Sequence, residues 1–288
     1  MNVARTAAEI EVRPRSVAIG TFDGVHLGHR AVVRAAVDAG LTPTVVTFHP
    51  HPRTVLGNRV ELLATLERRL ELLETCGIED VLVVEFSPEI AGLVPEEFAR
   101  QYLVGIGAQV VVAGSGFRFG RGRAGDLDLL RRLGVDARQV PIVEGVSSTR
   151  IRQLAHSGEV SGAATMLGRP LEVEGEVVGG DRRGATLGFP TANLAVDPEL
   201  LVPGFGIYAG AVGDRRAAIS IGVNPHYGGT ERRVEAYLLD WSGDLYGDRL
   251  VVEVWRRLRD ERAFGSEAEL VEQIARDVEE TRSASRPV

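Results

Sequence analysis

The chain has 288 residues, a length that favours two domains of ordinary size. Apolar residues make up 44% and charged residues 25% of it, which is typical of a soluble globular protein. The formal net charge of −7 argues against a general nucleic-acid-binding protein, because such proteins usually carry excess positive charge. No stretch has the apolar length of a membrane span or the apolar core of a secretion signal, so we expect a cytoplasmic protein without a membrane partner.

The sequence contains no lysine, and all 33 of its basic residues are arginines. Any phosphate-binding site must therefore use arginine, histidine or backbone N–H groups. Cys76 is the only cysteine, which excludes a disulfide framework and a thiolate metal site. We interpret Cys76 as a packing residue near the end of a helix.

In the first half of the chain, short valine-rich runs alternate with helical patterns that end at glycine. Continuous apolar runs are typical of strands buried on both faces, and they predict strands over residues 16–20, 43–48, 80–86 and 109–114. Strands that alternate with helices predict βαβ units and a parallel sheet. Ligands of such sheets bind at the carboxyl ends of the strands, which is where residues 20–29 and 48–52 fall.

In the second half, strand patterns follow one another across glycine-rich turns without helices between them. The predicted strands cover residues 171–180, 204–213, 215–223, 232–241 and 249–259. This pattern predicts a small antiparallel barrel or sandwich. A terminal helix follows, begun by a capping box of Ser266 and Glu269. Its apolar stripe is predicted to comprise Leu270, Val271, Ile274 and Val278. We place the two domains at residues 1–168 and 169–288.

The stretch "GTFDGVHLGH", residues 20–29, lies between a predicted strand and a predicted helix. Free N–H groups and the helix dipole favour phosphate at such a place. His26 and His29 are three residues apart, share one face of the first turn, and can donate hydrogen bonds to phosphate oxygens during a displacement. Two alternatives stay open here: a metal site completed by His49 and His51 of "FHPHP", and a capped helix whose histidines have no function.

A second group of polar residues lies in "GATLGFPTANLAV", residues 184–196. Thr191 and Asn193 share one side of an extended strand, and oxygen ligands of this kind suit Mg²⁺. In "RRVEAYLLDW", Glu235 faces away from its two neighbours in the strand, and a kinase acting on an alcohol needs a carboxylate near the hydroxyl group. From these residues alone, a turn without function at 184–196 and a solvated Glu235 are the favoured interpretations.

Nearly the whole chain resembles the bacterial bifunctional riboflavin kinase/FAD synthetases (FMN adenylyltransferases), members of the H-x-G-H nucleotidyltransferase superfamily. The motifs that carry the resemblance are "GTFDGVHLGH", "FHPHPR", "VVAGSGFRFGRGRAGD", "VSSTRIRQLAHSGEVSGAATMLGRP" and "GATLGFPTANLAV". The resemblance implies a Rossmann-like α/β domain followed by a riboflavin kinase-like antiparallel β-barrel with a terminal helix. It also implies two reactions with ATP: the second domain phosphorylates riboflavin to FMN, and the first adenylylates FMN to FAD with release of pyrophosphate.

The resemblance further assigns roles to individual residues. It implies that His26, His29 and Glu235 are catalytic and that Thr191 and Asn193 bind magnesium. Nucleotide and phosphate binding is implied for Gly20, Phe22, Asp23, Gly24, Gly28, Ser147, Ser148, Thr149, Arg152, Gly180, Gly184 and Gly188. Flavin binding is implied for Phe48, Pro50, His51, Phe117 and Arg259. The expected partners are riboflavin, FMN, ATP and Mg²⁺, and transient homo-oligomerisation stays open.

The chain departs from the family pattern at a few positions. Gly116 stands where the family usually has Asp or Asn, next to the expected meeting point of nucleotide and flavin. Ala185, His226 and Ala263 replace other common family residues in the second domain. These departures leave alternatives open: a member with one active half, an enzyme for a modified flavin or another nucleotide, or a non-catalytic flavin-binding regulator.

Overall fold

The computed structural model describes residues 1–180, 187–223 and 232–288. Contacts divide the chain into two compact units, which are described separately below. Unit 1 comprises Met1–Val60 and Thr65–Val146, and unit 2 comprises Glu61–Ala64 and Ser147–Val288. Among the helices in these described ranges, none is long and apolar enough to cross a membrane.

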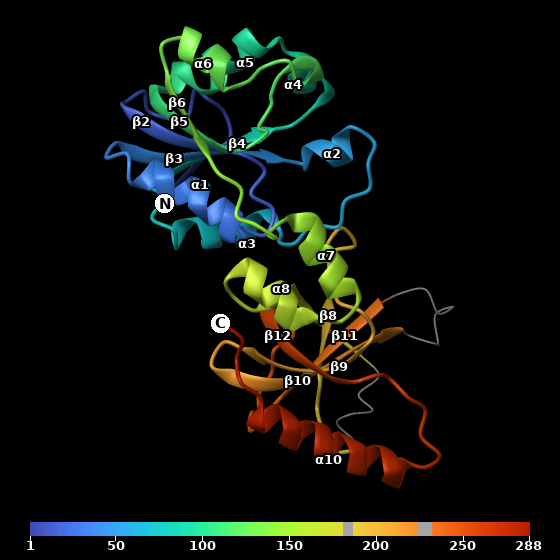
Figure 1. The fold of residues 1–288 in the computed structure, drawn as a ribbon. Helices are drawn as coiled ribbons and strands as arrows, with labels where there is room; N and C mark the ends of the chain where they lie inside the picture. The colour runs from blue at the N-terminus through green and yellow to red at the C-terminus, as the bar shows by residue number, and fades with distance from the viewer. Residues whose placement is uncertain (181–186, 224–231) are drawn as a thin grey trace. The chain divides into compact units, whose positions relative to one another are not determined.

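Unit 1 contains a six-stranded sheet in which every neighbouring pair of strands is parallel (Figure 1). Its strands are β1 (Asn2–Ala4), β2 (Arg15–Ile19), β3 (Thr42–His49), β4 (Asp80–Glu85), β5 (Ala108–Gly114) and β6 (Asp136–Val140). Their order is β1-β4-β3-β2-β5-β6, so the chain runs outward in one direction from β2 and then resumes on its other side at β5. The topological switch point therefore lies beyond the carboxyl ends of β2 and β5, where ligands bind in sheets of this kind.

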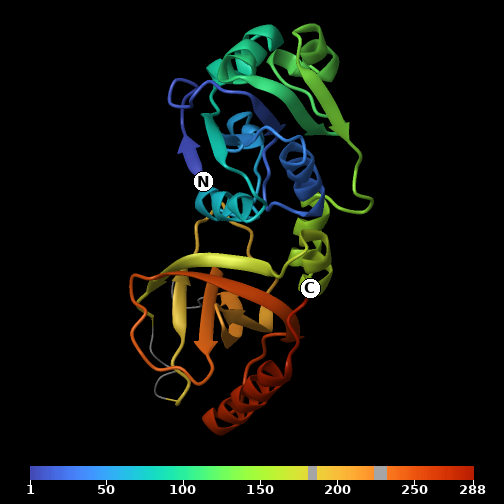
Figure 2. The ribbon, with the colours of Figure 1, turned by 90° about the vertical axis from the view of Figure 1, so that its left-hand side faces the viewer.

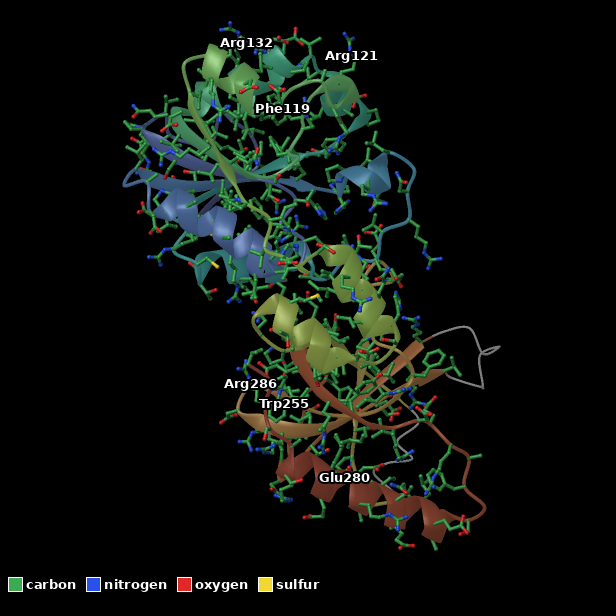
Figure 3. All side chains as sticks on the ribbon, in the orientation of Figure 1. Phe119, Arg121, Arg132, Trp255, Glu280 and Arg286 are labelled. Atoms are coloured by element: carbon green, nitrogen blue, oxygen red, sulfur yellow. The ribbon has the colours of Figure 1, made fainter. Side chains whose placement is uncertain are left out.

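Helices cover both faces of this sheet (Figure 2). They are α1 (Leu27–Val37), α2 (Pro52–Val55), α3 (Leu66–Glu74), α4 (Pro88–Gly92), α5 (Pro95–Tyr102) and α6 (Leu127–Arg132), with short 3₁₀ turns η1 (Val104–Ile106) and η2 (Arg121–Arg123). One core lies under α1 and α3, with Val33 and Leu73 fully buried. The other lies under α5 and α6, where Phe98 contacts Phe119 with ring centroids 5.6 Å apart (Figure 3). Two apolar faces explain why the central strands read as continuous apolar runs.

The sequence pattern missed the two edge strands, β1 and β6. β1 has only three residues, and β6 reads Asp-Ala-Arg-Gln-Val, with only Ala137 fully buried. An edge strand has a neighbour on one side only, and its polar residues reach solvent. Continuous apolar runs therefore identified the four interior strands and not the edges.

An ion cluster fixes the amino end of the sheet, opposite the ligand-binding end. The fully buried Arg15 contacts Asp80, and its Nη1 donates to the hydroxyl of Thr44 over 2.9 Å. Arg13 and Asn2 donate to the same Asp80 carboxylate over 2.7 and 2.9 Å. Burial alone would raise the pKa of Asp80, but these hydrogen bonds outweigh it and lower that pKa to about 2. The cluster therefore stabilises unit 1 only while Asp80 is ionised.

Unit 2 is a closed antiparallel barrel preceded by two helices, α7 (Ser148–His156) and α8 (Val160–Leu167). The barrel strands are β7 (Leu171–Val178), β8 (Ala192–Ala195), β9 (Gly206–Val212), β10 (Arg215–Val223), β11 (Arg232–Leu238) and β12 (Arg249–Arg259). Their order around the barrel is β10-β11-β8-β7-β12-β9. Of the two architectures expected for this half, the barrel is the one observed.

A short segment from the first half of the sequence belongs to unit 2. Leu62 forms a parallel bridge with Leu200: the N–H of Leu62 donates to Glu199, and the N–H of Leu201 donates to Leu62. Leu63 joins the barrel core. In packing, unit 2 thus begins at Ser147 and includes both helices that precede the barrel. The functional boundary at residue 168 stays a prediction.

The last helix, α10 (Glu267–Ser283), begins as predicted, and the predicted apolar stripe forms only part of its buried face. Ser266 caps the N–H of Glu269, while the Glu269 carboxylate accepts from the N–H of Gly265. Of the predicted apolar stripe, Val278 is buried and the other three residues are half-buried: Leu270, Val271 and Ile274. The other fully buried residues of the helix are Gln273, Asp277 and Thr281.

The predicted stripe was incomplete because arginines from the barrel require acceptors on this helix. Arg259 of β12 donates three hydrogen bonds to the carboxylate of Asp277, between 2.7 and 3.1 Å. Arg216 of β10 donates to the carbonyl of Thr281 over 3.1 Å and also bonds that of Ala284. Both arginines are half-buried, and a charge that is partly removed from water needs partners, so polar positions of α10 face the barrel.

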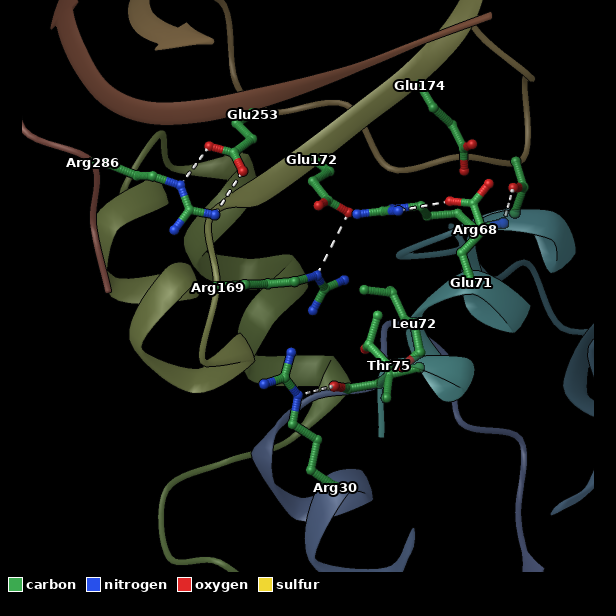
Figure 4. Close-up of polar contacts among 12 residues, drawn as sticks. Arg30, Arg68, Glu71, Leu72, Thr75, Arg169, Glu172, Glu174, Glu253 and Arg286 are labelled. Carbon is green, nitrogen blue, oxygen red and sulfur yellow. Dashed lines mark hydrogen bonds and ion pairs between the residues drawn. The ribbon is translucent and has the colours of Figure 1, made fainter. Parts of the chain in front are cut away.

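The C-terminal tail is also attached to the barrel. Arg286 donates to both carboxylate oxygens of Glu253 over 2.7 and 2.9 Å, and Arg169 pairs with Glu172 at 3.5 Å (Figure 4). The indole N–H of Trp255 donates to the same Glu253 carboxylate over 2.8 Å. These contacts order the tail against β12.

Candidate active sites

The loop after β2 is tightly wound around the start of α1. Phe22, Gly24 and Val25 all have positive φ angles, of 50°, 77° and 40°. A β-branched residue at positive φ is a true outlier, and strain of this kind is concentrated at functional sites. His26 ends the loop as the N-cap of α1. The loop therefore has a strained backbone conformation of the kind that is common at functional sites.

The two histidines of this loop form one stacked pair. Their ring centroids lie 3.6 Å apart with an interplanar angle of 14°, and Nδ1 of His26 accepts from the N–H of His29 over 3.2 Å. A Cβ atom at Gly28 would lie 3.2 Å from Cε1 of His26, so the glycine makes room for the ring. Gly20 plays the same part for the ring of Phe22, which would lie 3.3 Å from an added Cβ.

The electrostatic environment keeps one of the two rings neutral. Burial, the neighbouring His26 and the charge of Arg69 together hold the pKa of His29 well below its ordinary value. Nδ1 of His29 is shielded from solvent and has no hydrogen-bond partner among the described residues. At neutral pH, His29 is therefore an uncharged imidazole.

The expected flavin-side residues follow the neighbouring strand, β3. Phe48 is buried against Phe86 and Phe98, with centroid distances of 5.7 and 6.1 Å. The peptide bond before Pro50 is cis, and His51 caps α2 by accepting from the N–H of Arg53 over 3.1 Å. These residues lie at the carboxyl end of the sheet, as the sequence predicts.

Beyond β5, Gly116 and Phe117 lie on the other side of the switch point. Gly116 has a φ of 78°, and a Cβ atom there would have no neighbour within 4 Å. Asn and Asp adopt this conformation more readily than other side chains, which explains how Gly, Asn and Asp can share the position. Ser115 lies beside it and accepts from the amide of Gln139 over 3.3 Å. Phe117 is half-buried and stacks on Phe119.

The second predicted nucleotide motif, "SSTRIR", starts helix α7 of unit 2. Ser147 is the N-cap and accepts from the N–H of Arg150 over 3.2 Å, while Ser148 and Thr149 lie in the first turn. Arg152 donates through Nε to the carbonyl of Glu61 over 2.6 Å. The motif thus has the hydroxyl groups and the helix start that a phosphate site needs.

In the barrel, strand register brings outward-facing residues into one row. Cα partners across neighbouring strands run from Arg259 through Ile207, Ser220 and Glu235 to Asn193. The alternate residues of these strands fill the barrel core, including Ile219, Ile221, Val234 and Ala236. Glu235 therefore faces outward, away from its two neighbours in the strand, as predicted.

The predicted kinase residues of this row are in contact. The hydroxyl of Thr191 donates to Oε2 of Glu235 over 3.4 Å. Nε of Arg233 donates to Oδ1 of Asn193 over 3.1 Å and contacts Oε1 of Glu235. A Cβ atom at Gly180 would lie 2.3 Å from the amide nitrogen of Asn193. Only a glycine at position 180 therefore leaves room for the Asn193 amide.

Other predicted residues of the barrel vary in how they are placed. Gly188 has a φ of 87°, which suits a glycine turn. Arg259 is held by Asp277 and lies 5.7 Å from the ring centroid of Phe264. Gly184, Ala185 and His226 lie outside the described residues.

Sequence reasoning missed two ionisable residues near these sites. Arg69 of α3 is fully buried beside the histidine loop. The sequence feature that could have revealed Arg69 is its position: it lies three residues after Leu66 and three before Leu72, so a charge falls within the apolar stripe of "LERRLELLE". Glu261 lies against Gly222 of β10, where an added Cβ would meet its carboxylate. Burial raises the pKa of Glu261, and the charge of Glu235 adds to that effect.

A metal site built from histidines is not seen in the part of the chain that the structure describes. No three or more His, Cys, Asp or Glu side chains are grouped there to hold a metal ion. Thr191 and Asn193 are of other residue types, so this result does not bear on the oxygen donors that they offer.

Two family models match the chain in succession. A family model for FAD synthetase matches residues 9–153, and one for riboflavin kinase matches residues 167–285. The bifunctional riboflavin kinase/FMN adenylyltransferase of Bacillus subtilis (strain 168) is 36% identical over 94% of this chain and 92% of its own length. That of Escherichia coli (strain K12) is 35% identical over 90% and 89%.

A solved structure shares the fold over the full length. A crystal structure from Streptococcus pneumoniae, described as that of a macrolide-efflux protein, has a TM-score of 0.88 and 33% identity. The match covers 98% of this chain and 99% of that one. Since both family models and full-length relatives agree in order and extent, the chain belongs to the family of bifunctional riboflavin kinases/FMN adenylyltransferases.

Proposed function

We propose that the chain performs two successive transfers from ATP, with the product of one as the substrate of the other. Residues 169–288 phosphorylate riboflavin to FMN, and residues 1–168 adenylylate FMN to FAD. Full-length likeness to bifunctional relatives supports both activities. The histidine pair at the start of α1 supports the second reaction, and the contact of Thr191 with Glu235 supports the first.

In adenylyl transfer, a phosphate oxygen of FMN attacks the α-phosphorus of ATP, and the bond from that phosphorus to pyrophosphate breaks. His26 and His29 donate hydrogen bonds to the phosphate oxygens on which charge develops. The loop glycines, Gly20, Gly24 and Gly28, let phosphate approach the backbone N–H groups at the helix start. Phe22 and Asp23 shape the same loop.

The other residues of this reaction bind and orient its substrates. Ser147, Ser148 and Thr149 supply hydroxyl groups and N–H groups at the start of α7, and Arg152 supplies a guanidinium for phosphate. Phe48, Pro50, His51 and Phe117 contact the flavin. The half-buried Phe117, stacked on Phe119, supports this role, because a partly exposed aromatic ring beyond β5 can pack against a flavin.

The residues present in the barrel fit a magnesium ion. Thr191 and Asn193 offer a hydroxyl and an amide oxygen, and Gly180 lies against the Asn193 amide without a side chain. Hard oxygen donors of this kind are the ones Mg²⁺ prefers. When bound, Mg²⁺ would neutralise charge on the ATP phosphates. Gly180 and Gly188 would lie beside those phosphates, and the same role is proposed for Gly184, which lies outside the described residues.

Glu235 is the proposed general base of the kinase reaction. It accepts the proton of the riboflavin 5′-hydroxyl while that oxygen attacks the γ-phosphorus of ATP and the bond to ADP breaks. Arg233 contacts Oε1 of Glu235, so the side chain is held in one orientation with Oε2 toward Thr191. Arg259 orients the flavin, and three hydrogen bonds to Asp277 hold the Arg259 side chain in place.

A product assay tests both assignments. The purified chain is incubated with riboflavin or FMN, ATP and Mg²⁺, and riboflavin, FMN and FAD are separated. We expect His29→Ala to lose FAD formation from FMN by about 10²–10³-fold while riboflavin phosphorylation continues. Glu235→Ala should lose phosphorylation by about 10²–10⁴-fold and still adenylylate added FMN.

Two results would contradict the proposal. FMN without FAD from the unaltered chain would show that only the kinase half is active, a result for which Gly116 is the first residue to test. Flavin binding without any consumption of ATP would identify a non-catalytic binding protein.

A further inference from the structure

Helix α3 places an arginine in the core of unit 1. Arg69 is 1% exposed and lies in the same helix as the buried Leu72 and Leu73. Burying a guanidinium is costly unless hydrogen bonds and charges compensate it. An apolar side chain of similar length would fill the same space without that cost, so the distinct contributions of Arg69 are its hydrogen bonds and its charge.

The hydrogen bonds of Arg69 join two substrate loops. Its Nη1 donates to the carbonyl of Thr21 over 2.9 Å and to the carbonyl of Phe48 over 3.0 Å. The same nitrogen lies 3.3 Å from the hydroxyl of Thr47, which itself donates to the Thr21 carbonyl over 3.1 Å. Thr21 belongs to the histidine loop after β2, and Phe48 begins the flavin-side residues of β3. One buried cation thus fixes both loops relative to each other.

The charge of Arg69 also acts on this loop. Burial lowers the pKa of Arg69 and the buried Asp23 raises it, and an arginine remains protonated under both influences. The groups that act on His29 are the adjacent His26 and Arg69 itself, and together with burial they lower the pKa of His29. Nε and Nη2 of Arg69 are enclosed and have no hydrogen-bond partner among the described residues, so the cation is only partly compensated.

We infer that Arg69 is a positioning residue for adenylyl transfer, which ties the loop after β2 to the end of β3 and holds a fixed positive charge beside His29. The inference rests on the adenylyltransferase function proposed above. Arg69 acts through the carbonyls of Thr21 and Phe48 and through His29, and needs no contact with the substrates.

The test compares two substitutions of Arg69 with a matched control. Arg69→Met removes the charge and the hydrogen bonds, Arg69→Lys keeps the charge without the planar fork, and Arg34→Met makes the same change at an exposed arginine of α1. For each variant, kcat and KM of FAD formation from FMN are measured, and His29 is titrated by NMR. Riboflavin phosphorylation by unit 2 is measured in the same preparation.

We expect Arg69→Met to lower kcat of FAD formation by about 10²-fold, because misplacing a loop by an ångström has effects of that size. The pKa of His29 should rise toward its ordinary value, while riboflavin phosphorylation is unchanged. Arg69→Lys should lower kcat by about tenfold and leave the pKa of His29 low, since the charge remains. Arg34→Met should match the unaltered chain.

The inference is wrong if Arg69→Met leaves either kcat or the pKa of His29 unchanged. If Arg69→Met does not fold, Arg69→Lys decides: an unchanged kcat in that variant overturns the inference, and a reduced kcat with a low pKa of His29 supports it. If the unaltered chain makes no FAD from FMN, the proposed function fails instead. The His29 titration still tests the effect of Arg69 in that case.

Discussion

The two candidate sites of this protein are built in different ways. The site in unit 1 is formed by backbone: a loop with three positive φ angles and a helix start, with the buried Arg69 behind the loop. The site in unit 2 is formed by side chains that strand register aligns on the outer face of a barrel. The first depends on how a segment is wound, whereas the second depends on which residues occupy neighbouring strands.

This difference predicts how each site responds to change. A register-built site should lose activity through one displaced side chain while the barrel keeps its stability, because the barrel core lies on the opposite side of the strands. A backbone-built site should respond to substitutions that alter loop conformation, including ones that add no new contact. Single methyl groups, added at glycines, can separate the two cases.

The largest effect is expected from Gly180→Ala in the barrel. The new Cβ would lie 2.3 Å from the amide nitrogen of Asn193, so this short side chain must rotate away from its present position. Riboflavin phosphorylation should fall by about 10²-fold, as for other displacements of an ångström. The melting temperature should change little, because only a side-chain end has to move.

The neighbouring Gly179→Ala is the matched control for this substitution, since a Cβ at Gly179 has nothing within 4 Å. It should phosphorylate riboflavin like the unaltered chain. Equal losses in both variants, or full activity in both, would show that the Asn193 amide does not contribute as proposed.

The next largest effect concerns the amino end of the unit 1 sheet, far from its site. The folded pKa of Asp80, about 2, lies below its ordinary value of 3.8, so the ionised carboxylate stabilises the fold. This contribution of about 2 kcal/mol is fully present above pH 4 and is lost as the pH falls toward 2. Asp80→Asn should destabilise unit 1 by at least that amount at pH 7, and the difference should vanish near pH 2.

Spectroscopy can assign this loss to one unit. Both tryptophans, Trp241 and Trp255, belong to unit 2, so their fluorescence follows the barrel, while circular dichroism follows both units. The dichroism transition should move and the fluorescence transition should not. Asp128→Asn, at an exposed surface pair, is the control with no expected shift. A fluorescence shift as large as the dichroism shift would mean that the two units unfold together.

Much of this arrangement could be predicted from the sequence, and the failures have physical causes. Apolar runs identified the interior strands, and alternation identified the outward face of Glu235. Edge strand β6 was missed because its polar residues reach solvent. The polar part of the buried face of α10 was missed because Arg259 lies distant in sequence and selects Asp277 as its partner.

Arg69 shows the same limit at the candidate site. A charged residue in an apolar stripe could have been noticed, but its partners are backbone carbonyls of two other segments. Main-chain partners leave no mark on residue type, so local patterns cannot reveal them. The roles that family likeness assigns to His26, His29, Thr191 and Asn193 remain predictions until the variants are assayed.

A smaller effect is expected from Gly24→Ala in the loop of unit 1. Gly24 has a φ of 77°, and a side chain in this conformation costs about 1–2 kcal/mol. If the loop must hold this conformation for catalysis, FAD formation should fall by about tenfold, since 1.4 kcal/mol corresponds to that factor. Gly40→Ala has the same backbone penalty, with φ at 75°, outside the site. Equal loss of FAD formation in both variants would show a general loss of stability instead.

The smallest effect is expected from Gly116→Asn. It tests whether the lack of a polar side chain at this position lowers the adenylyltransferase activity. The position has a φ of 78° and open space around an added Cβ, so asparagine should fit there without displacing a neighbour. If a polar group at this position contacts the nucleotide or the flavin, one new hydrogen bond worth about 0.5–1.5 kcal/mol should raise kcat/KM for FAD formation by about 2–10-fold. Gly134→Asn, at a φ of 86° in an equally open turn, controls for the backbone change alone. An unchanged kcat/KM in Gly116→Asn would mean that this site works without a side chain at 116. The residue to replace next would then be Ser115, because it lies beside Gly116 and already accepts a hydrogen bond.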